Sequence, residues 1–233
     1  MTHLSGDIRS DTLAKPIVTA AEAVEGIADG SVVLVGGWGG VGVPHALLTA
    51  LAATSVSELV VVTNNCGMGH RGDVGLLFEA GRVRKAITSF PIHPAGVEFR
   101  GALARDEVEV ELVPQGTLVE RMRAAGAGLG GFFTPTSAGT PLGEGKEERT
   151  IDGRLQVFET ALHGDVALVH GHRADTYGNL RYRYAAGAFN STMAMAANRV
   201  IVEVDEIASD PLDPEQVDTA GIFVDSLTVV GAP

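Results

Sequence analysis

The stretch that decides the fold is residues 31–51, SVVLVGGWGGVGVPHALLTAL. Residues 32–35 form a continuous apolar run that ends at glycines, which is typical of a strand buried on both faces. Pro44 suits the first turn of a helix, and Leu47, Leu48 and Leu51 give that helix an apolar face. The stretch therefore predicts a strand, a glycine-rich loop and a helix, which together form the first unit of a βαβ fold.

The same alternation continues along the chain. Strands are expected at residues 59–62, 85–89, 108–113, 166–169, 200–204 and 222–224, and helices at 75–80, 98–105, 117–126 and 191–197. The spacing Thr117-x-x-Glu120 is that of a capping box, Asp152-Gly153 predicts a hairpin turn, and residues 126–145 are predicted to form a lid or a long functional loop. We therefore expect an α/β fold, with an open and mostly parallel sheet covered by helices, as one domain over residues 1–233.

Composition excludes several classes of protein. Hydrophobic residues make up 45% of the 233 residues, which argues against disorder, and one cysteine cannot form an internal disulfide. The net charge of −12 argues against nucleic acid and anionic membrane surfaces as partners. Residues 31–57 lack charged side chains but carry glycines and a proline at their centre, so they do not predict a membrane span. Charged residues at positions 7, 9, 11 and 15 argue against a signal peptide, and we expect a cytoplasmic protein.

Two motifs suggest other chemistry. Residues 37–42 match the dinucleotide fingerprint G-x-G-x-x-G, which keeps a nicotinamide-dependent oxidoreductase open as an alternative. The acidic residue that such a fold needs near the end of the second strand is replaced by Thr63-Asn64-Asn65. Three histidines, His163, His170 and His172, flank one predicted strand without a second cluster of ligands, so no metal site is expected. Cys66 is expected to be a small buried residue and not a catalytic thiol.

Five loops follow the predicted strands. In an open parallel sheet, ligands bind outside the carboxyl ends of the strands, so these loops are expected to converge on one crevice. The loops are rich in glycine and neutral donors, which suits a carboxylate or an acyl oxygen held against backbone N–H groups. They cover residues 36–42, 63–69, 89–91, 113–116 and 132–140.

Residues 29–44 and several further motifs resemble those of the A (alpha) subunit of the family I CoA-transferases. The resemblance extends over roughly residues 16–230. In the motif at residues 29–44, Trp38 replaces the phenylalanine that is usual in the family. The others are Thr-Asn-Asn at 63–65, Val-Pro-Gln-Gly-Thr-Leu at 113–118, Phe-Thr-Pro-Thr at 133–136, Glu-Gly-Lys-Glu at 144–147 and Met-Ala-Met-Ala-Ala at 193–197. Residues 75–77, 84–85 and 89–91 resemble the branch of the family that uses 3-oxoadipate, although Ile92 stands where those relatives often carry arginine.

The resemblance implies the family I CoA-transferase fold and a reaction without a metal or redox cofactor, with coenzyme A as a substrate. It also implies a partner B subunit, in a heterodimer or heterotetramer, that carries the nucleophilic glutamate in a Glu-Asn-Gly motif that this sequence lacks. A succinyl-CoA donor and 3-oxoadipate as acceptor are favoured. Two further alternatives remain: the acceptor is acetoacetate or acetate, or the chain is a binding module without catalytic activity.

Gln115 is expected by resemblance to donate its amide to the oxyanion across the subunit interface; its alternative role is a turn position between Pro114 and Gly116. The remaining residues expected at the substrate site are Gly37, Trp38, Gly39, Gly40, Asn64, Asn65, Phe133 and Thr136.

Overall fold

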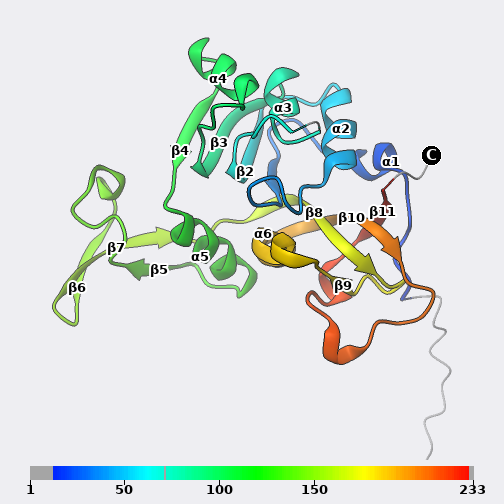
Figure 1. Cartoon of the computed structure of the whole chain (residues 1–233). Coiled ribbons are helices and arrows are strands. Elements are labelled where there is room, and N and C mark those ends of the chain that lie inside the picture. The colour runs from blue at the N-terminus through cyan, green and yellow to red at the C-terminus, as the bar shows by residue number, and fades with distance from the viewer. Residues whose placement is uncertain (1–12, 71, 231–233) are drawn as a thin grey trace, which may run out of the picture.

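The computed structural model describes residues 13–70 and 72–230 (Figure 1). The helices are α1 (Ala20–Val24), α2 (His45–Ala53), α3 (Gly75–Glu79), α4 (Val97–Ala104), α5 (Gln115–Gly126) and α6 (Gly187–Ala196). The strands are β1 (Val32–Val35), β2 (Leu59–Asn65), β3 (Val83–Phe90), β4 (Glu109–Leu112), β5 (Gly131–Thr134), β6 (Glu148–Ile151), β7 (Arg154–Thr160), β8 (Gly164–Ala174), β9 (Leu180–Arg181), β10 (Ala197–Ile207) and β11 (Ser226–Val229). Short 3₁₀ turns lie at Pro141–Gly143, Tyr184–Ala186, Pro214–Gln216 and Gly221–Phe223.

The main sheet has the strand order β11-β10-β8-β1-β2-β3-β4, and every pair along this path is parallel. The short strand β9 lies off this path and runs antiparallel to β8. The expectation of an open and mostly parallel sheet is confirmed. The strand–loop–helix unit that opens the sequence becomes β1, residues 36–42 and α2, and β1 lies near the middle of the sheet.

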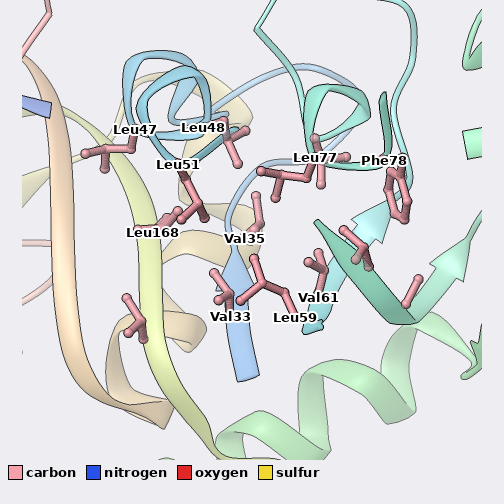
Figure 2. Packing of buried hydrophobic residues seen from close by; sticks show 14 of the residues in the cluster. Val33, Val35, Leu47, Leu48, Leu51, Leu59, Val61, Leu77, Phe78 and Leu168 are labelled. Atoms are coloured by element: carbon pink, nitrogen blue, oxygen red, sulfur yellow. The ribbon is translucent and has the colours of Figure 1, made fainter. Parts of the chain in front are cut away.

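Helices cover both faces of the sheet, so the molecule has three layers. Side chains alternate along each strand, and Val33 and Val35 of β1 therefore join one buried cluster while Leu34 joins the other. The first cluster packs under α1–α4 and includes Leu47, Leu51 and Phe78 (Figure 2). The second packs under α5 and α6. This double coverage explains why the strands are apolar runs with little alternation.

Helix α5 begins two residues earlier than predicted. Its N-cap is Pro114, and Thr117 is a buried residue inside the first turn, so the expected capping box at Thr117 is wrong. A Thr-x-x-Glu box does cap α1, where the side chains of Thr19 and Glu22 bond each other's backbone N–H groups. Pro114 has an extended ψ of 137° and lies just outside the helix, which places Gln115 at the first helical position and not in a turn.

Residues 126–145 are not a free lid. They include β5, which forms a three-stranded antiparallel sheet in the order β5-β7-β6. In Figure 1 this small sheet extends beyond α5, away from the main sheet. The hairpin turn at Asp152-Gly153 is confirmed, with φ of 49° and 75° at the two residues. It joins β6 to β7.

The last strand also differs from the expectation. Gly221–Phe223 is a 3₁₀ turn, and β11 follows it at Ser226–Val229. Within the described ranges, the chain has no helix whose length and hydropathy would allow it to cross a membrane. The expectation that the chain starts without a signal peptide concerns mainly residues 1–12, which lie outside the described residues.

Candidate functional site

The register of the main sheet aligns the ends of four neighbouring strands. Val35 pairs with Thr63, Thr63 with Thr88, and Thr88 with Leu112. The loops that follow β1, β2, β3 and β4 therefore leave the sheet side by side at its carboxyl edge, where open α/β sheets bind ligands.

The glycine loop (residues 36–42) forms a tight turn beyond β1. The backbone N–H of Trp38 donates to the carbonyl of Val41 at 2.9 Å, and the N–H of Val41 donates back at 3.0 Å. Gly39 and Gly40 between them have φ of 58° and 83°, as a type I′ turn requires. The turn leaves the Trp38 side chain 46% exposed at the tip of the loop.

A small hollow lies between the glycine loop and the loop after β2. Gly37, Gly40 and Asn65 all line it, so the structure brings these three predicted site residues together. Asp73 also lines it, and its carboxylate accepts hydrogen bonds from the N–H groups of Met68 (2.8 Å), His70 (3.1 Å) and Gly75 (2.8 Å). The loop after β2 is thus ordered by its own buried carboxylate.

Three of the predicted residues lie outside that hollow. Trp38 and Gly39 form the exposed side of the turn. Asn64 is buried, and its Nδ2 donates to Ser89 Oγ at 2.9 Å, which ties the end of β2 to the end of β3.

A second hollow opens at the start of α5. Gln115 is exposed at the first helical position and lines this hollow together with Phe132, Thr134 and Thr136. The first N–H groups of a helix have no intrahelical partner and carry a partial positive charge. Thr136 is a predicted substrate-binding residue that the structure places in the same hollow as Gln115. Among the described residues that line the hollow, Glu120 supplies the one carboxylate, and it accepts a hydrogen bond from Arg123 Nε at 2.8 Å.

Phe133 requires a correction. Side chains alternate along β5, and Phe132 and Thr134 face the hollow while Phe133 does not line it. Phe133 packs instead on Phe158, with ring centroids 5.1 Å apart, and under the guanidinium of Arg149 at 4.7 Å. Phe132, and not Phe133, is therefore the aromatic residue that lines this hollow. Four of the five loops are divided between two hollows, residues 89–91 line neither of them, and the single crevice that was expected is not formed.

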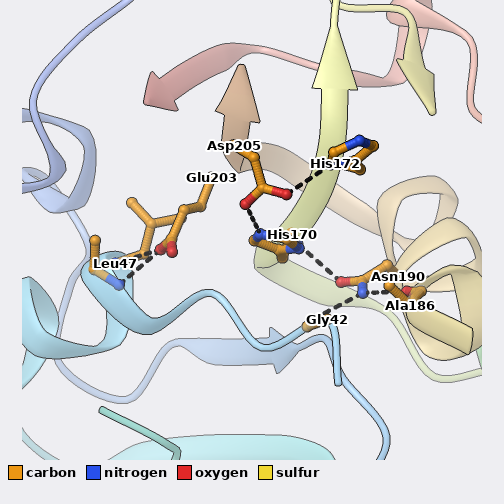
Figure 3. Close-up of polar contacts among 9 residues, drawn as sticks. Gly42, Leu47, His170, His172, Ala186, Asn190, Glu203 and Asp205 are labelled. Atoms are coloured by element: carbon orange, nitrogen blue, oxygen red, sulfur yellow. Dashed lines mark hydrogen bonds and ion pairs between the residues drawn. The ribbon is translucent and has the colours of Figure 1, made fainter. Parts of the chain in front are cut away.

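Several polar residues near this edge were missed from the sequence. Asn190 of α6 is fully buried and contacts the glycine loop, and Glu203 of β10 is buried against the start of α2 (Figure 3). Glu203 stands inside the apolar run of residues 200–204, and a carboxylate in a buried strand is a signal that could have identified it. Asn190 carries no comparable signal.

The histidines form a different arrangement from a metal site. His170 Nε2 lies 3.1 Å from Asp205 Oδ1, and His172 Nδ1 lies 2.8 Å from Asp205 Oδ2 (Figure 3). They lie near a larger hollow on the α1–α2 side, whose ionisable lining residues are His45, His170, Glu203 and Asp205. No group of three or more potential metal ligands occurs among the residues that the structure describes. Cys66 is buried, as expected, and burial raises the pKa of its thiol to about 12.

Comparison with known proteins gives a family. The family profile described as coenzyme A transferase matches residues 17–229. The chain is 47% identical over 217 residues to the A subunit of 3-oxoadipate CoA-transferase from Pseudomonas putida, covering 93% of this chain and 94% of the relative. It is 45% identical over 222 residues to the A subunit of succinyl-CoA:3-ketoacid coenzyme A transferase from Xanthomonas campestris pv. campestris (strain B100), covering 94% and 90%.

Solved structures share the fold. An acyl-CoA transferase from Escherichia coli O157:H7, in a thioester complex with CoA, superposes with a TM-score of 0.81 at 22% identity; the match covers 94% of this chain and 48% of that longer one. Glutaconate coenzyme A-transferase from Acidaminococcus fermentans gives 0.80 at 20% identity, covering 91% and 75%. At these identities the likeness supports the fold alone, and the family follows from the sequence matches. The chain belongs to the coenzyme A transferase family.

Proposed function

We propose that this chain is the A (alpha) component of a CoA-transferase that moves CoA from succinyl-CoA to a 3-oxo acid, with 3-oxoadipate as the favoured acceptor. The names of the two relatives described above support this proposal. Their identities to this chain, 47% and 45%, are too similar to separate the two acceptors. Family membership favours this function over a nicotinamide-dependent oxidoreductase.

The proposed reaction uses a glutamate on a partner B subunit. Its carboxylate attacks the carbonyl carbon of the donor thioester, which breaks the C–S bond and gives an acyl-glutamyl anhydride and CoA thiolate. The thiolate attacks the glutamyl carbonyl of the anhydride, releases the donor acid and forms a glutamyl-CoA thioester. The acceptor acid then reverses the sequence. No atom changes its oxidation state, so the proposed steps need no redox cofactor. The steps as written also include no metal.

Each addition step places negative charge on a carbonyl oxygen, which needs hydrogen-bond donors. The observation that carries the proposal is the position of Gln115. Its side chain is exposed at the first position of α5, beside helix N–H groups, at the carboxyl edge of the sheet. An amide at that place can donate to an oxyanion that forms in a partner's active site, whereas Glu120 in the same hollow is already paired with Arg123.

The partner is the first point to test. This chain should be purified alone and with a B subunit that carries the Glu-Asn-Gly motif, incubated with succinyl-CoA, and treated with borohydride or hydroxylamine. We expect CoA transfer and a trapped glutamate in the complex only, with the modified peptide in the B subunit. An adduct on this chain would contradict the proposal. A stable complex that transfers no CoA would favour a binding module without catalytic activity.

The acceptor is the second point. The complex should be assayed with 3-oxoadipate, acetoacetate and acetate at equal concentrations, and kcat/KM compared. The highest value is expected for 3-oxoadipate. A higher value for acetoacetate would move the chain to the succinyl-CoA:3-ketoacid branch without changing the proposed mechanism. Titration of the isolated chain with NADH checks the oxidoreductase alternative, and no binding is expected.

A further inference from the structure

Asn190 joins three parts of the fold that lie far apart in the sequence. It belongs to α6, is fully buried, and packs between β1, β8 and the glycine loop. Its Nδ2 donates to the carbonyl of Gly42 at 2.9 Å and to the carbonyl of Ala186 at 2.7 Å (Figure 3). Its Oδ1 accepts from the backbone N–H of His170 at 3.0 Å. Both donor hydrogens and the acceptor oxygen of the amide are therefore in use.

The glycine loop is shaped around this side chain. A Cβ placed on Gly36 would lie 1.8 Å from Asn190 Oδ1, and one placed on Gly42 would lie 2.7 Å from Asn190 Nδ2. Gly36 and Gly42 are the first and last residues of the loop, so one amide contacts both of its ends. Glycine is required at both positions because only its backbone can approach the amide this closely.

Asn190 also ends the pairing between β1 and β8. The N–H of Gly36 donates to the carbonyl of Leu168 at 2.9 Å. In a regular parallel ladder, the N–H of His170 would next donate to the carbonyl of Gly36. That N–H donates to Asn190 Oδ1 instead. The side chain thus takes the place of the next ladder bond at the point where the chain turns away from the sheet.

A second buried residue fixes the segment after the loop. Glu203 Oε2 accepts from the N–H groups of Ala46 (2.7 Å) and Leu47 (3.0 Å) at the start of α2. The tip of the loop, from Trp38 to Val41, is closed by its own two hydrogen bonds. Asn190 is thus the side chain that connects the two ends of the loop to the sheet and to α6.

We propose that Asn190 is a positioning residue, which holds the glycine loop in one conformation against the carboxyl edge of the sheet. It does not touch substrate; it acts through Gly36 and Gly42 on the loop between them. The consequence for CoA transfer rests on the function proposed above, because a preorganised loop stabilises a transition state only where that loop borders the reacting groups.

The chain provides a probe for this proposal. Trp38 is the one tryptophan in the sequence and lies at the tip of the glycine loop. Its fluorescence anisotropy and its quenching by acrylamide report on the loop without any enzyme assay. In Asn190→Ala, which removes all three hydrogen bonds, we expect lower anisotropy and a higher quenching constant. In Asn190→Asp, which keeps the acceptor for His170 but turns a carboxylate towards two carbonyl groups, we expect a change in the same direction.

A matched control separates positioning from general loss of stability. Asp175 is equally buried and accepts hydrogen bonds from the N–H groups of Tyr177, Asn179 and Leu212 at the far end of β8. Asp175→Asn should lower the Tm while leaving the Trp38 signal of the folded protein unchanged. An Asn190→Ala protein with wild-type anisotropy and quenching would overturn the proposal, and so would an Asp175→Asn protein with the same fluorescence change.

Gly36 gives an independent test of the contact. Gly36→Ala forces a methyl group against Asn190 and should lower the Tm and alter the Trp38 signal. All three nearest atoms to the added Cβ belong to Asn190, so Gly36→Ala should cost much less Tm in the Asn190→Ala background. Additive Tm losses would contradict the contact. Gly36→Ala and Asn190→Asp also keep the test available if Asn190→Ala does not fold.

The effect of Asn190 on catalysis is measured with the complex of this chain and the B subunit. Asn190→Ala should lower kcat by about 10-fold or more with a smaller change in KM, because the loop is displaced while substrate contacts persist. An unchanged kcat together with a changed Trp38 signal would show that the loop is positioned by Asn190 but does not contribute to catalysis. If the wild-type complex transfers no CoA, the proposed function fails, and the fluorescence and Tm experiments still decide the role of Asn190.

Discussion

The carboxylate of Glu203 accepts a hydrogen bond from the backbone N–H of Ala46, with 2.7 Å between Oε2 and the nitrogen. Helix α2 has no cap from its own chain segment, because Pro44 at the N-cap position makes no side-chain hydrogen bond. Glu203 supplies that cap from β10, 157 residues away in sequence. The helix that follows the glycine loop is therefore held at its first turn by the main sheet.

Removal of this carboxylate should destabilise the fold. Glu203→Ala leaves the buried N–H of Leu47 and the part-buried N–H of Ala46 without an acceptor, and is expected to cost about 1–3 kcal/mol. Glu203→Gln keeps an oxygen acceptor and should cost less. Urea denaturation at pH 7 measures both, and equal stability of the two variants would argue against the cap.

The carboxyl group of Glu203 should also make the free energy of unfolding depend on pH. Burial raises the pKa of Glu203, and this effect outweighs the lowering by the N–H groups of Leu47 and Ala46 and by His170 and His45. In the native state Glu203 thus keeps its proton to higher pH than in the unfolded chain. Its contribution to the free energy of unfolding is therefore fully present below pH 4.5, the ordinary pKa of a glutamate. That contribution declines as the pH rises through the raised pKa. The free energy of unfolding of the wild type minus that of Glu203→Gln should fall across this window. A pH-independent difference would contradict the raised pKa.

Gln115 gives the direct catalytic prediction. Gln115→Ala should lower kcat of the reconstituted complex by about 10- to 1000-fold, because it removes one oxyanion donor. The side chain is exposed, so the Tm of the chain should change little. Gln216→Ala, at another exposed glutamine, is the matched control and should retain full activity. A normal kcat in Gln115→Ala would remove Gln115 from the mechanism.

Local signals predicted much of the fold. The run of residues 32–35, the glycines after it and Pro44 identified β1, the glycine loop and α2, because each depends on short-range preferences of the backbone. The hairpin at Asp152-Gly153 was predicted for the same reason, since both residues tolerate positive φ. The parallel sheet followed from the repetition of this pattern, which leaves few topologies open.

Features that depend on neighbours in space were harder to predict. Phe133 was predicted from the motif at 133–136, whereas the register of β5 on β7 decides that Phe132 lines the hollow beside Gln115. The same small sheet replaced a predicted lid, since its strands are short and partly exposed. Asn190 contacts a residue 148 positions away, and nothing in its own segment indicates that contact.

Cys66 should be inert in the native protein. Burial raises the pKa of its thiol to about 12, and a side-chain hydrogen bond with Thr88 offsets only part of that rise. At pH 8 the thiolate is therefore scarce and shielded from solvent. A thiol reagent such as DTNB should label the chain only when urea is added. Rapid labelling of the folded protein would show that the loop after β2 opens at Cys66.

The side chain of Arg121 should hold helix α5, which carries Gln115, in place against the main sheet and the small sheet. Its Nη1 donates to Glu111 Oε1 of β4 at 2.8 Å, and its Nε donates to the carbonyl of Thr160 in β7 at 2.9 Å. The helix that carries Gln115 is thus bonded to both sheets. Arg121→Met keeps the aliphatic bulk but removes these bonds, and we expect a loss of about 2 kcal/mol in the free energy of unfolding.

Acidification should reduce the difference in free energy of unfolding between the wild type and Arg121→Met. Burial raises the pKa of Glu111, but hydrogen bonds from Arg121 and Lys85 outweigh it, so the net pKa is lowered. The wild type should therefore lose stability as pH falls below 4.5 through the lowered pKa, and Arg121→Met should lose less. Arg123→Ala, on the same helix with an exposed pair to Glu120, is the control and should change the free energy of unfolding much less than Arg121→Met does. If Arg121→Met is as stable as that control, the side chain of Arg121 does not hold the two sheets together, and the position of Phe132 beside Gln115 does not depend on it.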